Sequence, residues 1–129
     1  AVGGRLGLPL DSLCRALLRY EPSGSRLRVL AAASGATVID DCYNAAPESM
    51  VGALEALLAT PTGAGGRRIA VLGEMRELGG HAADAHRTVG EAVARLRPDT
   101  LVLVGEGTRP LHAAALMDRF PPDAVHTFG

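Results

Sequence analysis

Residues 68–105, RIAVLGEMRELGGHAADAHRTVGEAVARLRPDTLVLVG, decide the fold class that this sequence predicts. The stretch begins and ends with uninterrupted apolar runs, at 68–73 and 100–105, which are typical of parallel strands covered on both faces. The intervening residues 81–97 predict an amphipathic helix that Pro98 ends. A strand, a helix and a second strand in this order predict a right-handed crossover in a parallel sheet. The apolar stripe of the helix consists of Ala85, Val89, Ala92, Val93 and Leu96.

The same alternation continues on both sides of this stretch. Two short β-prone runs upstream are separated by Ser34-Gly35, so we expect them to pair as a hairpin. Together the elements predict an α/β fold, with a Rossmann-like, doubly wound and mostly parallel sheet that has helices on both faces. The further elements expected are strands at 28–32, 37–41 and 124–128, a helix at 47–59 that begins with proline, and a helix that Thr108 caps.

The first residues follow a separate pattern. Leu10, Leu13, Leu17 and Tyr20 fall at i, i+3, i+7 and i+10, which places them on one face of a helix. The segment 21–25, EPSGS, then interrupts the pattern. We therefore expect one unit to end here, and a hinge to join it to the next unit.

The composition excludes several classes of protein. All 13 basic residues are Arg, so the chain has neither a complete phosphate-binding P-loop nor a lysine for Schiff-base chemistry. The net charge of −1 offers no basic footprint for nucleic acid, and no apolar run is long enough to cross a membrane. Two distant cysteines, Cys14 and Cys42, form no disulfide framework, which favours a reduced, cytoplasmic protein.

Polar residues gather where the predicted strands end, which is where open α/β sheets bind ligands. The loop 105–110, GEGTRP, is a partial G-x-G-x-x-G, so a dinucleotide-binding module is one alternative. The acidic pair Asp40-Asp41 suggests a phosphoacceptor domain, although that chemistry normally requires a Lys. No His lies four residues from another His or Cys, so we expect no metal site.

Several motifs in the same order resemble the Mur ligase family. Residues 40–50, DDCYNAAPESM, are similar to its D-D-S-Y-N-A-N-P-x-S-M, and residues 70–79, AVLGEMRELG, are similar to its A-V-L-G-D-M-x-E-L-G. Shorter matches occur at 25–27, 86–91 and 103–105. Co-linear motifs are much more specific than any single one.

The resemblance implies that 27–129 is the C-terminal Rossmann-like ligase domain, without the family's last strand, and that 1–26 is a remnant of the central ATPase domain and hinge. Mur ligases with these motifs join D-alanyl-D-alanine to UDP-N-acetylmuramoyl-tripeptide through an acyl phosphate. They use ATP and Mg²⁺, bound mainly by the central domain. The chain alone, without the N-terminal and central domains as partners, is expected to be inactive.

The same resemblance assigns binding roles but no catalytic residue within the chain. A guanidinium suits phosphate, a carboxylate accepts hydrogen bonds from ribose, and Tyr and Asn side chains suit a flat ring and its edge. Ala46 departs from the family's Asn, which admits a non-catalytic or diverged Mur-ligase-like binding domain as the alternative. The residues implied are Arg26, Asp41, Tyr43 and Asn44 for the nucleotide, and Ser49 and Glu74, which replaces an Asp, for the substrate.

Overall fold

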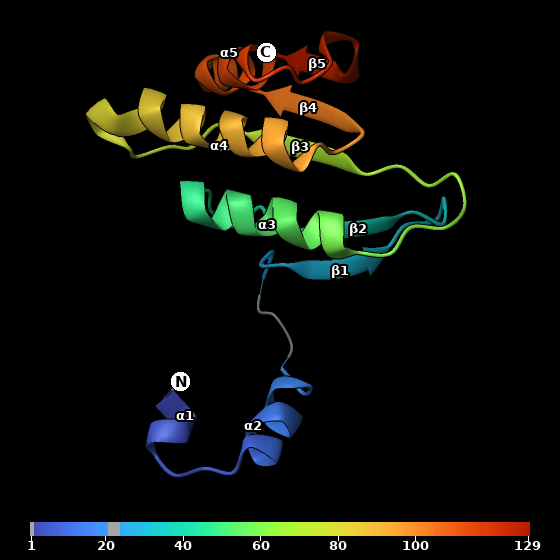
Figure 1. The fold of residues 1–129 in the computed structure, drawn as a ribbon, viewed down its shortest axis with the longest axis vertical. Coiled ribbons are helices and arrows are strands. Elements are labelled where there is room, and N and C mark those ends of the chain that lie inside the picture. The colour runs from blue at the N-terminus through green and yellow to red at the C-terminus, as the bar shows by residue number, and fades with distance from the viewer. Residues whose placement is uncertain (1, 21–23) are drawn as a thin grey trace. The chain divides into compact units, whose positions relative to one another are not determined.

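The computed structural model describes residues 2–20 and 24–129, so part of the expected hinge, at 21–23, lies outside the described residues. The chain divides into two compact units with a boundary after Asp40 (Figure 1). The hairpin belongs to the first of these compact units, and the expected domain boundary between residues 26 and 27 stays a prediction.

The first unit contains two short helices and the predicted hairpin. Helix α1 (Val2–Arg5) is followed by α2 (Leu10–Leu17), and strands β1 (Arg28–Ala31) and β2 (Thr37–Asp40) pair antiparallel. The expected hairpin is therefore confirmed, with Gly35 at a φ of 84° in its turn. Within the described part of this unit no residue is buried, and the apolar stripe of α2 is largely exposed.

The second unit is the predicted alternation of strands and helices, and its sheet is parallel in the order β3-β4-β5. Residue pairs Ala70↔Leu101 and Leu103↔Thr127 give the register of the two ladders. Short 3₁₀ turns precede α4, α5 and β5. The elements are α3 (Pro47–Ala59), β3 (Ile69–Gly73), α4 (Ala82–Leu96), β4 (Thr100–Val104), α5 (Arg109–Met117) and β5 (Val125–Phe128).

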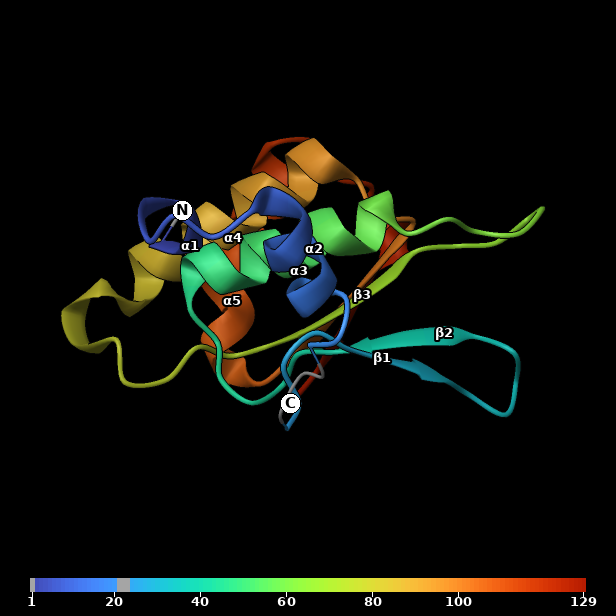
Figure 2. The ribbon, with the colours of Figure 1, turned by 90° about the horizontal axis from the view of Figure 1, so that it is seen from below.

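One face of this sheet carries the core. The inward residues of β3 and β4, among them Leu72 and Leu101, form a single cluster with residues of all three helices. Figure 2 shows α3, α4 and α5 gathered over the strands. Helices α4 and α5 approach closely at Gly90, where an added Cβ would lie 2.8 Å from the Cβ of Ala114. A small residue is therefore required at this crossing.

On the opposite face of the sheet the strand residues are more exposed, and α4 and α5 both pack on the core face. Ile69, Val71 and Val104 point to that side and are 47%, 64% and 43% exposed. The strands thus alternate between buried and exposed residues. The physical reason is the strand order, because right-handed crossovers that all step in one direction place α4 and α5 on the same side.

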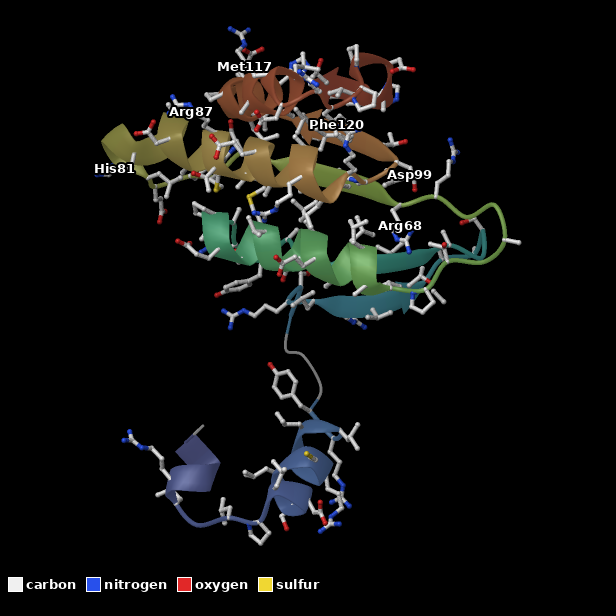
Figure 3. All side chains as sticks on the ribbon, in the orientation of Figure 1. Arg68, His81, Arg87, Asp99, Met117 and Phe120 are labelled. Atoms are coloured by element: carbon white, nitrogen blue, oxygen red, sulfur yellow. The ribbon has the colours of Figure 1, made fainter. Side chains whose placement is uncertain are left out.

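Two further contacts set the ends of the strands. At the amino edge, the backbone N–H of Arg68 donates to Asp99 Oδ2 at 2.7 Å, and its Nη2 donates to the Thr60 carbonyl at 3.3 Å (Figure 3). At the carboxyl edge, Thr108 occupies the N-cap position of α5, but its hydroxyl donates to the Gly105 carbonyl at 2.7 Å. The expected side-chain cap is therefore absent, because a 3₁₀ turn runs directly into α5.

Candidate functional site

The turn that carries the first motif, residues 41–46, lies on the surface between β2 and α3. Tyr43 is 66% exposed, Asn44 is exposed, and Asp41 is half-buried. Ala45, the next residue, packs against the core cluster and fixes the end of the turn. The polar side chains of this motif are therefore presented to solvent from an anchored backbone, and they are accessible to a ligand.

Arg26 belongs to the other unit and is exposed there. It lies two residues before β1. The structure thus brings Asp41, Tyr43 and Asn44 together in one turn and places Arg26 in a separate unit. The nucleotide-binding roles of these four residues remain predictions.

Ser49 closes the first turn of α3. Its hydroxyl accepts a hydrogen bond from the Ala46 backbone N–H at 3.1 Å and donates to the Ala46 carbonyl at 3.0 Å. Ala46 occupies the N-cap position and has no polar side chain to cap the helix. The Ser49 hydroxyl therefore pairs the backbone N–H of Ala46, the N-cap residue. This is one of the two hydrogen bonds that make up a capping box.

Glu74 joins the ends of β3 and β4. Its Oε1 accepts a hydrogen bond from Arg76 Nε and forms an ion pair with Arg76 Nη2, and its Oε2 accepts the Gly107 N–H at 3.3 Å. These donors lower the pKa of Glu74, the Arg76 hydrogen bond most and the Gly107 N–H next. The carboxylate thus stays ionised and links two loops at the edge of the sheet where a ligand is expected.

Glu74 also explains the glycines of the partial G-x-G motif. A Cβ on Gly105 would lie 3.0 Å from Glu74 Oε2, and one on Gly107 would lie 2.9 Å from the same atom. Gly105 has a φ of 93°, which favours glycine as well. Both glycines leave room for a carboxylate of the same chain, so their spacing gives no separate support for a dinucleotide.

His86 bonds to the residue that follows Glu74. It is buried, its Nε2 accepts the Met75 N–H at 3.0 Å, and its Nδ1 lies 2.7 Å from the Ala82 carbonyl. Since a carbonyl only accepts, Nδ1 carries the proton and the ring is the neutral tautomer. Met75 is buried as well, so the residue after Glu74 is fixed.

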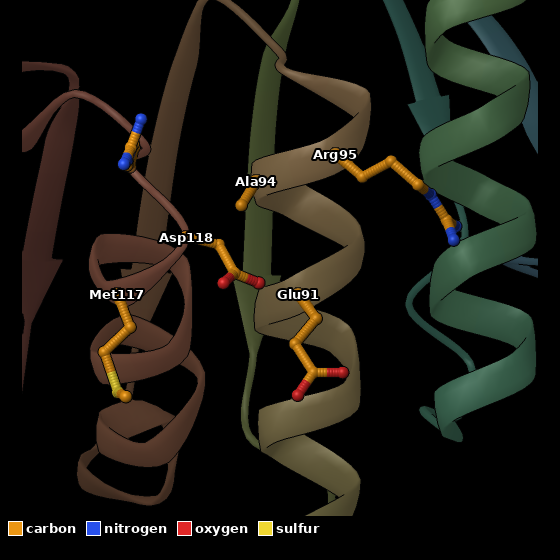
Figure 4. A pocket seen from close by; sticks show the side chains of 6 residues that line it. Glu91, Ala94, Arg95, Met117 and Asp118 are labelled. Carbon is orange, nitrogen blue, oxygen red and sulfur yellow. The ribbon is translucent and has the colours of Figure 1, made fainter.

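Two cavities lie in the second unit. One, of about 210 Å³, is at the carboxyl edge and includes Gly105, Arg109 and His112 in its lining. The other, of about 360 Å³, lies over the last turns of α4 and α5, with Glu91 and Asp118 in its lining (Figure 4). Those turns lead to the amino ends of β4 and β5, so the second cavity is remote from the two long motifs, although Glu91 closes the shorter match at 86–91.

Other features of the described ranges bear on ligands and location. Within 2–20 and 24–129, no three His, Cys, Asp or Glu residues are grouped so as to hold a metal ion. In the same ranges no helix has both the length and the hydropathy of a membrane-spanning segment.

An α/β domain with polar loops at the carboxyl edge of a parallel sheet is the class that this fold and site define. Residues 25–129 match the family model described as "Mur ligase, glutamate ligase domain". The chain belongs to the Mur ligase family, and it is one of that family's C-terminal α/β domains.

Two relatives carry the same name. UDP-N-acetylmuramoyl-tripeptide–D-alanyl-D-alanine ligase of Mycobacterium tuberculosis (strain H37Rv) is 39% identical over 123 residues, which cover 92% of this chain and 24% of that protein. The enzyme of the same name from Escherichia coli is 30% identical, over 89% of this chain and 25% of that protein.

Solved structures agree with the sequence comparison. A crystal structure of MurF from Acinetobacter baumannii superposes with a TM-score of 0.74 at 29% identity, covering 98% of this chain and 25% of that one. The chain thus spans about a quarter of the length of the relatives that it matches. The expected α/β class and the family resemblance are confirmed.

Proposed function

We propose that this chain is the C-terminal part of an ATP-dependent ligase that joins D-alanyl-D-alanine to UDP-N-acetylmuramoyl-tripeptide. The name that both relatives carry supports this proposal, and so does the solvent exposure of Tyr43 and Asn44 in the first long motif. The enzyme would work in the cytoplasm, where its soluble substrates and ATP are found. Its other domains would be the partners of this chain.

Arg26 and the exposed turn at 41–46 would bind the nucleotide. Arg26 would place its guanidinium on phosphate oxygens, and Asp41 would accept hydrogen bonds from a ribose hydroxyl. Tyr43 offers a flat ring for stacking, and the Asn44 amide offers both a donor and an acceptor. Closure of this edge over the nucleotide would exclude water from the acyl phosphate.

We expect ATP and Mg²⁺ to bind between this chain and another domain, because the described part of this chain lacks the groups to hold them by itself. The described residues hold no cluster of metal ligands, and the sequence has no Lys for a P-loop. ATP supplies the phosphoryl group that activates the tripeptide carboxylate. The residues of this chain would bind and orient the nucleotide, and would exclude water.

On the substrate side we place Glu74 and Ser49. The Glu74 side chain is 32% exposed at the carboxyl edge. The Ser49 hydroxyl already bonds to both the N–H and the carbonyl of Ala46. A substrate contact by Ser49 would therefore accompany its capping role.

The test is the coupling of ADP release to both substrates in the whole ligase that contains this chain. We expect ADP to form only when precursor tripeptide and D-alanyl-D-alanine are both present. Equal ADP formation with D-alanine alone would refute the substrate assignment. The Asn44→Ala variant should raise the KM for ATP while the circular dichroism spectrum stays unchanged.

The second candidate is a non-catalytic binding domain descended from a ligase. The observation that favours it is Ala46, where the family's Asn is missing. It predicts that the whole protein binds the nucleotide or the precursor in calorimetry but releases no ADP with any acceptor. Restored ADP release in Ala46→Asn would assign the loss to this one position.

A further inference from the structure

Arg76 is a surface arginine that the chain holds in one position. Its side chain is 82% exposed, yet Nε donates a hydrogen bond to Glu74 Oε1 at 3.1 Å, and Nη2 forms an ion pair with the same oxygen at 3.0 Å. An exposed ion pair adds little to stability. The arrangement is therefore better explained by what the held guanidinium contacts than by the stability of the fold.

Glu74 is itself held from the opposite side. Its second oxygen accepts the Gly107 N–H, and Gly105 and Gly107 leave the space that its carboxylate occupies. Met75, between the paired residues, is buried and bonded to His86. The backbone and the carboxylate that orient Arg76 are thus both anchored, while the guanidinium itself is exposed.

The part of the guanidinium that Glu74 leaves unused suits a carboxylate. Arg carries five N–H donors in a planar fork, and the described contacts of Arg76 use Nε and one side of Nη2. The remaining Nη1 and Nη2 donors can bind a second carboxylate with two parallel hydrogen bonds. A neutral ligand would gain much less from this geometry.

We propose that Arg76, positioned by Glu74, binds the terminal carboxylate of the acceptor dipeptide, an inference that rests on the proposed function. In amide formation the amine of the acceptor attacks the acyl phosphate, so the amine must stay free of strong contacts. The carboxylate is then the group by which the enzyme can hold the acceptor and direct its amine. Arg76 lies at the carboxyl edge of the sheet, where that acceptor is expected.

The experiment compares D-alanyl-D-alanine with D-alanyl-D-alaninamide, which lacks the carboxylate, in the whole ligase. The unmodified enzyme should show a KM about tenfold to a hundredfold higher for the amide, the range expected for a charge-assisted pair. Arg76→Gln should raise the KM for the dipeptide by a similar factor and remove its advantage over the amide. The KM for ATP should stay unchanged.

A double variant tests whether Glu74 acts by positioning Arg76, because the effects of the two substitutions should then not add. Glu74→Ala alone should raise the KM for the dipeptide, and it should have little further effect when combined with Arg76→Gln. If Glu74 had only a structural role, the KM increases of Glu74→Ala and Arg76→Gln would add, and Glu74→Ala would lower kcat with every acceptor. Arg95→Gln, an exposed arginine near the end of α4, is the matched control and should change neither KM.

The outcomes separate the two proposals. If the ligase is active and Arg76→Gln still prefers the dipeptide over the amide, the role of Arg76 is overturned and the proposed function stands. An unmodified enzyme that releases no ADP with the dipeptide would overturn the proposed function. Thermal unfolding of each variant, followed by circular dichroism, confirms that Arg76→Gln is folded, and Arg76→Lys provides a second variant that keeps the charge without the planar fork.

Discussion

At the scale of the single residue, Ser49 compensates for a helix start that lacks a polar N-cap. It bonds to both backbone groups of Ala46. We expect Ser49→Ala to lower the free energy of unfolding by about 1 kcal/mol, the net value of a typical hydrogen bond. Urea unfolding measures this loss.

Ala46→Asn is the complementary change. An N-cap asparagine stabilises a helix by about 1 kcal/mol relative to alanine. The variant should therefore be more stable than the unmodified chain in the same urea titration. A decrease in stability would show that the backbone at Ala46 cannot direct a side chain toward the free N–H groups of α3.

Glu74 gives a prediction about pH. Its pKa is lowered by Arg76 and the Gly107 N–H, so the stability that its charge contributes is fully present above the usual glutamate pKa of about 4.3. That contribution is lost as the pH falls through the lower pKa of the folded state. An NMR titration of the Glu74 side-chain carboxyl carbon should give a midpoint below the ordinary value.

The matched variants identify the cause of that shift. Arg76→Gln removes the strongest hydrogen bond to Glu74 and should raise the NMR midpoint toward the ordinary value. Arg87→Gln breaks a different exposed ion pair, with Asp84, and should leave the midpoint unchanged. Equal midpoints in all three proteins would contradict the role of Arg76.

At the scale of the element, the crossing of α4 and α5 depends on Gly90. A Cβ there would contact the Leu111 carbonyl oxygen and the Ala114 side chain too closely. Gly90→Ala should therefore lower the free energy of unfolding by about 1–3 kcal/mol, as overpacking does. Denaturant unfolding followed by circular dichroism tests this expectation.

Gly52 in the middle of α3 is the control for that substitution. No atom lies within 4 Å of a Cβ added there. Gly52→Ala should stabilise the protein by about 0.5–1 kcal/mol, because alanine loses less backbone entropy in a helix. If both alanine variants stabilised the chain, the close approach of α4 and α5 would not be what requires glycine at position 90.

At the scale of the whole molecule, every buried apolar residue in the described ranges belongs to the second unit. Residues 41–129 should therefore unfold cooperatively when produced alone, as burial of apolar surface is the main favourable term in folding. Their melting temperature should lie within about 5 °C of that of the full chain, a difference of about 1 kcal/mol for a domain of this size. A non-cooperative melt would show that residues 1–40 are required.

Much of the fold could be predicted because local patterns carry it. The helix expected at 47–59 is present with the same bounds, and the strands beginning at residues 28, 37 and 100 were expected at those positions. Proline at the start of a helix and short apolar runs act within a few residues, so one sequence is enough to detect them. Which face of the sheet carries the core could not be predicted, since it depends on the order of the strands.

The candidate site divides in the same way. The exposed turn at 41–46 and the importance of Glu74 were indicated by motifs, but the partners of Glu74 were not. Arg76 occupies a variable position of its motif, and Gly107 lies 33 residues away from Glu74. Only folding brings β3 and β4 side by side, so no local pattern could reveal this contact.

The sequence by itself determined the family, the alternation of strands and helices, and the positions of the polar loops, because each depends on neighbours along the chain. The tertiary structure alone decided which face of the sheet holds the core, how closely α4 approaches α5, and that Glu74 accepts the Gly107 N–H. These features depend on distances between residues far apart in the sequence. Such distances exist only once burial of the apolar face has packed the helices on the sheet.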